Sequence, residues 1–68
     1  MQHLTITGTI DGENANFVLA PTPTYAEIYR NDLLQSPFTD YSRTGAEVEF
    51  ISHPIPQQGD ILVAMGEV

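Results

Sequence analysis

The chain has 68 residues, a length typical of one small domain. Its nine acidic residues face two arginines and no lysine, so the formal net charge is -7 and the pI is near 4.2. Direct binding to nucleic acid or to an anionic membrane surface is therefore not expected, because both depend on basic side chains. With 41% hydrophobic residues and no cysteine, we expect residues 1–68 to fold as one acidic domain stabilised by packing, without disulfides or thiolate metal sites.

The first 19 residues predict a β-hairpin. Residues 4–10 alternate apolar and polar side chains with the period of a half-buried strand, and Asp11-Gly12 follows, a preferred centre for a two-residue type I′ turn. With that turn, Leu4 lies opposite Leu19, and both strands present one apolar face. The residues of this face are Leu4, Ile6, Ile10, Phe17 and Leu19.

Residues 24–35 predict a helix. Thr24 and Glu27 have the spacing of a capping box, in which the two side chains satisfy free backbone N–H groups at a helix start. An apolar stripe at helical spacing follows, and Pro37 biases the preceding residue away from helical angles. The stripe comprises Tyr25, Ile28, Tyr29 and Leu33.

The second half of the chain predicts a loop over residues 37–45 and two further strands. Residues 47–50 alternate, with Val48 and Phe50 inward, whereas residues 61–65 form a continuous apolar run. The expected fold class is α+β, in the order ββαββ, with one helix packed on a four-stranded antiparallel or mixed sheet.

No pattern in the sequence supports catalysis, a metal site or a cofactor. Ser52-His53 is the one serine beside a histidine, but neighbouring residues of an extended chain point to opposite faces. His3 and His53 are too far apart in the sequence for a common ligand spacing, and the glycines do not match a phosphate-binding loop. We therefore expect a non-enzymatic protein with no cofactor and no metal.

The acidic residues suggest a partner with a basic groove. Glu47 and Glu49 lie two apart on one strand face, about 6.8 Å from each other, which matches two steps of about 3.4 Å along a DNA strand. Tyr41 lies in a polar stretch that is hard to bury, where it is either a contact residue or a loop anchor. The predicted partner-binding residues are Glu47, Glu49, Asp40, Tyr41, Glu27 and Asp32.

This pattern favours an inhibitor that blocks the nucleic-acid site of a protein or nucleoprotein complex by charge mimicry. In size, acidity and standalone organisation the chain is similar to phage-encoded anti-restriction and anti-CRISPR inhibitors, a resemblance of composition alone. Neither a membrane-spanning segment nor a signal peptide is recognisable, so we expect a cytoplasmic protein, in the host cell if it is phage-encoded. A surface that is acidic for solubility alone is the competing interpretation.

A second hypothesis is a small structural or assembly subunit that self-associates through an exposed strand edge. The apolar run at residues 61–65 and the short tail after it motivate this hypothesis. The two functions are compatible in one respect, because an inhibitor can also form a homodimer.

Overall fold

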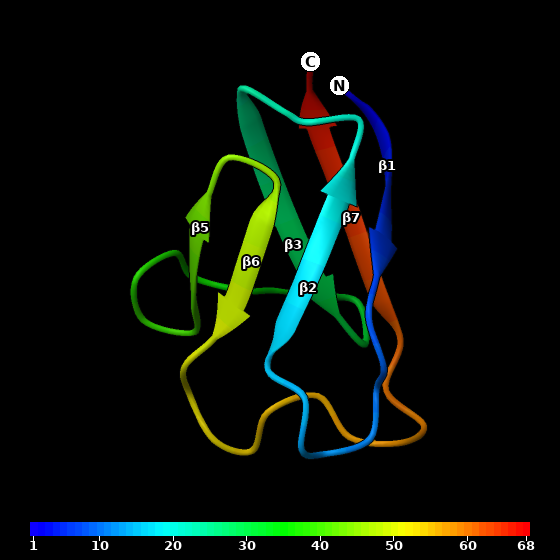
Figure 1. Cartoon of the computed structure of the whole chain (residues 1–68), viewed down its shortest axis with the longest axis vertical. Helices are drawn as coiled ribbons and strands as arrows, with labels where there is room; N and C mark the ends of the chain where they lie inside the picture. Colours follow the sequence, from blue (N-terminus) through cyan, green and yellow to red (C-terminus); the bar gives the residue numbers. More distant parts are fainter.

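The computed structural model describes all residues 1–68 and contains strands but no helix, so the expected α+β class is wrong. Seven strands form one curled antiparallel sheet in the order β4-β3-β7-β1-β2-β6-β5 (Figure 1). In chain order they are β1 (Gln2–Thr7), β2 (Asn16–Ala20), β3 (Tyr25–Arg30), β4 (Leu33–Leu34), β5 (Tyr41–Thr44), β6 (Glu47–Phe50) and β7 (Leu62–Glu67).

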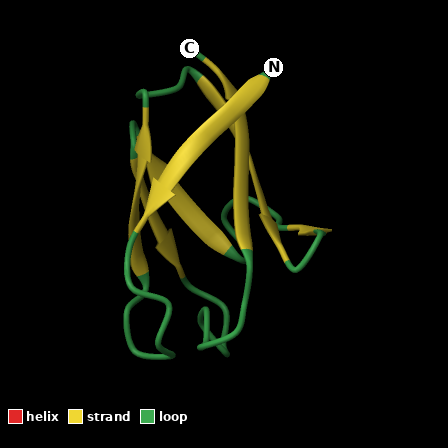
Figure 2. Ribbon diagram, turned by 90° about the vertical axis from the view of Figure 1, so that its right-hand side faces the viewer, coloured by secondary structure: helices red, strands yellow, loops and turns green.

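Strand β1 holds the two halves of the sheet together. Its residues 2–4 pair with β7, and its residues 5–7 pair with β2. The sheet therefore bends at β1 and curls into a half-barrel, with the two halves facing each other across the core (Figure 2). Strands β4 and β5 are left as its two edges.

The first hairpin forms, but with a different register and a longer connection. Leu19 lies opposite Ile6 instead of Leu4, a slip by two residues that leaves each side chain on its predicted face. Residues 8–15 form the connection, in which Oδ1 of Asp11 accepts the backbone N–H groups of Glu13 and Asn14, both at 2.9 Å. Asp11 therefore organises a wide loop rather than a two-residue turn.

The segment predicted as a helix is a second hairpin, made of β3 and β4. Its side chains alternate, with Ala26 and Ile28 buried in the core and Tyr25 exposed on the other face. Strand β3 pairs with β7 along all six of its residues. Its backbone hydrogen bonds are therefore made to β7 and not within its own segment, as a helix would require. The capping-box residue Thr24 instead donates its backbone N–H and its hydroxyl to the carbonyl of Glu67.

The turn between β3 and β4 explains why the helix does not form. Asn31 and Asp32 both have positive φ, 52° and 70°, as a type I′ hairpin turn requires. Asn and Asp accept these angles more readily than other residues with a Cβ. The apolar spacing of Tyr25, Ile28 and Tyr29 fits a helix, but aromatic and β-branched residues also favour a strand. Pairing with β7 decides in favour of the strand.

The remaining strands agree with the sequence in part. Strand β6 has the predicted bounds and faces, with Val48 and Phe50 buried and Glu47 and Glu49 exposed. Strand β5 lies in the segment predicted as a loop. The apolar run at residues 61–65 falls largely within β7, which pairs with β1 on one side and with β3 on the other.

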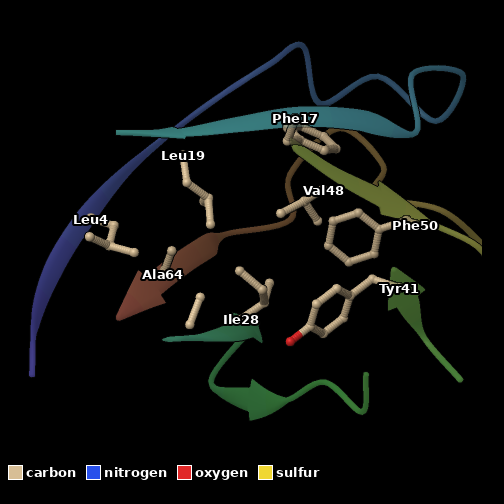
Figure 3. Packing of buried hydrophobic residues seen from close by; sticks show 9 residues of the cluster. Leu4, Phe17, Leu19, Ile28, Tyr41, Val48, Phe50 and Ala64 are labelled. Atoms are coloured by element: carbon tan, nitrogen blue, oxygen red, sulfur yellow. The ribbon is translucent and has the colours of Figure 1, made fainter. Parts of the chain in front are cut away.

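The core lies between the two halves of the curled sheet (Figure 3). The ring of Phe17 meets Phe50 edge-on, with ring centroids 5.6 Å apart, and Tyr41 packs on Phe50 from β5. A Cβ at Gly8 would lie 2.3 Å from the Phe17 ring, so only glycine leaves room for this packing. The buried hydrophobic residues are Leu4, Phe17, Leu19, Ala26, Ile28, Tyr41, Val48, Phe50 and Ala64.

Candidate functional site

Many of the acidic side chains serve the fold itself. Asp60 shows this most clearly: Nη2 of Arg30 lies 2.7 Å from its Oδ2, while the backbone N–H of Gln57 and the side-chain amide of Asn31 donate to the same carboxylate. These donors, led by the Gln57 N–H, hold the pKa of Asp60 below its usual value. Asp60 thus fixes the long connection before β7 to the β3 turn.

Both arginines are also engaged within the chain. Besides Asp60, Arg30 binds the carbonyls of Pro54 and Ile55. Arg43 on β5 donates to its neighbour Gly45 and, at 3.4 Å, to the carbonyls of Pro23 and Thr24, which precede β3. Arg43 therefore bridges the two ends of the curled sheet, and neither cation neutralises the outer surface.

Glu47 and Glu49 are brought together on an outer face without a cation. Asn16, Glu49 and Ser42 form one row across β2, β6 and β5, while Val18, Glu47 and Thr44 form the next. Neither carboxylate has an ion-pair or hydrogen-bond partner within the chain. A shallow groove of about 220 Å³ runs along these two rows. We call this surface the acidic face.

The other predicted contact residues lie elsewhere. Asp40 accepts the backbone N–H of Ser36 at 2.8 Å and the hydroxyl of Ser52 at 3.3 Å, so it organises its own loop. Tyr41 is 2% exposed and anchors that loop in the core, the second of its two expected roles. Asp32 lies at the exposed tip of the β3–β4 turn. The six residues therefore do not form one surface.

Glu27 lies on the outer face of β3 between two tyrosines. The hydroxyls of Tyr25 and Tyr29 donate to its two carboxylate oxygens, each at 2.9 Å. These hydrogen bonds to an anion raise the pKa of both phenols above the usual value of 10.0. No cation takes part, so two neutral hydroxyl donors alone stabilise this half-buried carboxylate. The sequence did not predict this cluster, because all three residues were expected on a helix.

Exposed apolar side chains gather at the β4 edge. Leu33, Leu34 and Phe38 are 69%, 59% and 83% exposed, although all three are large and hydrophobic. Leu33 and Leu34 form the edge strand β4, and Phe38 follows four residues after it. Three large apolar side chains that are this exposed within one short segment favour an interaction site there. We call Leu33, Leu34 and Phe38 the edge patch.

The histidine, serine and acidic side chains considered for chemistry lie apart or serve the fold. The structure contains no cluster of three or more His, Asp or Glu side chains suited to a metal ion. Ser52 uses its hydroxyl for Asp40, and His53 lies exposed in the following loop. The chain also has no helix that could cross a lipid bilayer.

Comparison with known proteins gives no relative. The chain matches no family model, no curated protein sequence and no solved structure. Its function must therefore be inferred from its own surfaces.

Proposed function

We propose that this protein is a non-enzymatic structural or assembly module that associates with a second copy through the β4 edge. The observation that carries the proposal is the edge patch, three large apolar side chains exposed beside a strand with one unpaired side. Such an edge is a template for pairing with another strand. The run at residues 61–65, which first suggested self-association, lies inside the sheet as β7 and is not part of this edge.

The backbone of β4 is suited to pairing with itself. Asn31-Asp32 is a two-residue turn, so Arg30 and Leu33 close the hairpin, and the N–H of Gln35 donates to the carbonyl of Ile28. The backbone N–H and C=O groups of Leu33 and Gln35 thus point toward β3, whereas those of Leu34 point away from the sheet. Two copies related by a twofold axis can exchange both hydrogen bonds at Leu34 and cover the edge patch.

The charge distribution near the edge tolerates this pairing. With Leu34 opposite Leu34 of the second copy, Asp32 lies opposite Ser36, so no carboxylate faces another directly. The remaining repulsion is long-range, between two copies of charge -7, and salt screens it. Association through the edge patch is therefore expected to strengthen as salt increases.

Sedimentation velocity over a range of protein and salt concentrations tests this proposal. The expected result is a monomer–dimer equilibrium that shifts toward dimer with salt. Leu33→Glu places a carboxylate beside the twofold axis and is expected to abolish the dimer. Ile61→Glu, at a residue 65% exposed outside the edge patch, is the matched control and should leave the dimer intact. A monomer at all concentrations, or equal loss of the dimer in both variants, would rule out dimerisation through the β4 edge.

A second function, charge mimicry toward a basic groove, is favoured by one specific observation. The acidic face carries Glu47 and Glu49 side by side without a partner, in a chain whose two arginines are engaged elsewhere. Binding of this kind weakens with salt, the opposite of the trend expected for the edge.

The mimicry hypothesis is tested by capturing partners of the tagged protein from a lysate at low and high salt. Glu47→Gln with Glu49→Gln is expected to lose a nucleic-acid-handling partner that the wild type retains at low salt. Glu13→Gln with Asp32→Asn removes the same charge at two exposed positions off the acidic face and is expected to keep it. Loss of the partner in both double variants would mean that binding depends on the net charge and not on the acidic face.

A further inference from the structure

A small hollow lies beside Glu27 at the open side of the curled sheet. Its volume is about 100 Å³, well below the roughly 300–1,000 Å³ of pockets that hold whole small molecules. A single side-chain head group is the size of ligand that it fits. The hollow is lined by Tyr25, Ala26, Glu27, Leu34, Gln35, Pro37 and Tyr41.

The polar atoms of the hollow are acceptors without a cation. The Glu27 carboxylate accepts one phenol hydroxyl at each oxygen, which leaves further lone pairs on both. The side-chain nitrogen of Gln35 is occupied by the carbonyl of Leu33 at 2.9 Å, so its amide oxygen remains free to accept. Elsewhere the chain pairs a half-buried carboxylate with arginine, as in Asp60, whereas no basic side chain lines this hollow, and nearby Arg43 donates to backbone carbonyls.

Tyr41 supplies an independent observation. Tyr41 is 2% exposed and is one of the residues that line the hollow, and its hydroxyl makes no hydrogen bond within the chain. In Figure 3 the Tyr41 hydroxyl points out of the aromatic cluster toward the Ile28 side, where β3 lies. No buried side-chain oxygen or nitrogen of the chain lacks a hydrogen-bond partner, so this hydroxyl remains accessible and is free to bind a polar group in the hollow.

We propose that this hollow binds one basic side chain, a lysine ammonium or an arginine guanidinium, presented by another protein. The head group would donate to Glu27 and to the Tyr41 hydroxyl, while its aliphatic stem packs on Pro37 and the half-exposed Tyr25 ring. Cation–π attraction to the tyrosine adds to the ion pair. The occupant is not a second copy of this chain, because the chain lacks lysine and engages both arginines internally.

Titration with blocked tripeptides, followed by NMR, tests this site without knowledge of the natural partner. The probes are Ac-Gly-Lys-Gly-amide and Ac-Gly-Arg-Gly-amide, with norleucine and citrulline analogues as neutral counterparts. The expected result is a saturable shift of the Tyr25, Glu27 and Tyr41 signals with at least one basic peptide and none with its neutral analogue. Binding by either basic peptide supports the site and identifies its head group.

Variants separate the site from general attraction to an acidic protein. Glu27→Gln is expected to weaken binding about tenfold or more, the usual effect of losing a hydrogen bond to a charged group. Tyr41→Phe keeps the ring in the core and is expected to weaken peptide binding about two- to tenfold. Glu47→Gln removes a charge from the acidic face and should leave binding unchanged. Equal shifts with neutral peptides, shifts centred on Glu47 and Glu49, or unchanged affinity in Glu27→Gln would overturn the proposal.

Discussion

Arg30 and Asp60, at the end of β3 and just before β7, are joined by an ion pair of 2.7 Å and by a hydrogen bond from Nε at 3.0 Å. The same carboxylate accepts donors from Gln57 and Asn31, so it links one hairpin turn to a long connection that has no regular structure of its own. This link determines where β7 begins beside β3.

The lowered pKa of Asp60 predicts a specific sensitivity to acid. Because the folded state favours the ionised carboxylate, its stabilising contribution is present above the unfolded pKa of 3.8 and is lost as the pH falls from there through the lower folded-state pKa. Asp60→Asn is therefore expected to lower the free energy of unfolding at pH 7 and to flatten its decline between pH 5 and 3. Urea titrations across this range measure both effects. An acid decline as steep as that of the wild type would contradict this role.

The turn at Asn31-Asp32 gives a test whose sign depends on the secondary structure. Asp32 has a φ of 70°, which glycine adopts without steric cost, so Asp32→Gly is expected to stabilise the protein by about 0.5–1 kcal/mol. In a helix the same change would destabilise by a similar amount. Thermal and urea unfolding of the variant distinguish the two cases, and a clear loss of stability would argue against the hairpin.

The hydrogen bonds to Glu27 predict an alkaline shift that one substitution removes. The pKa values of Tyr25 and Tyr29 are raised, so the stabilisation from their protonated forms is complete below about pH 10 and is lost as the pH rises through the folded-state pKa values. In Glu27→Gln both phenols are expected to titrate at lower pH than in the wild type, as measured by absorbance or ring NMR signals. Unchanged titration curves would mean that the carboxylate does not hold these hydroxyls.

Burial of Ile28 predicts a measurable cost for the loss of one methylene. Its side chain is 0% exposed, between β7 and the aromatic cluster, so Ile28→Val is expected to destabilise by about 0.5–1.5 kcal/mol. Ile61→Val, at an exposed residue, should change the stability by less than about 0.5 kcal/mol. Chemical denaturation of both variants provides the comparison, and equal effects would contradict the assignment of Ile28 to the core.

Local pattern predicted part of this fold well. The inward faces of β1, β2 and β6 follow from strict alternation, and a slip by two residues in the first hairpin leaves those faces unchanged. The prediction for the segment around Ile28 was wrong because its apolar spacing fits both a helix and a strand, and the outcome depended on pairing with β7, 32 or more residues later in the chain. Long-range pairing of that kind overrides local propensity.

The candidate sites were predictable to different degrees. Glu47 and Glu49 follow from alternation alone, and they lie together on the acidic face. The edge patch and the hollow beside Glu27 depend on the β3–β4 hairpin, which the sequence analysis interpreted as a helix. The Asn31-Asp32 pair was the available signal, because both residues tolerate the positive φ of a type I′ turn.

Self-association through the β4 edge requires the outward-facing N–H of Leu34 to pair with a second copy. Amide hydrogen exchange at Leu34, measured at low and high protein concentration, tests it most directly. We expect fast exchange at Leu34 in the dilute monomer and marked protection at high concentration, with amides of the acidic face unaffected. Exchange at Leu34 that is equally fast at both concentrations would contradict self-association through this edge.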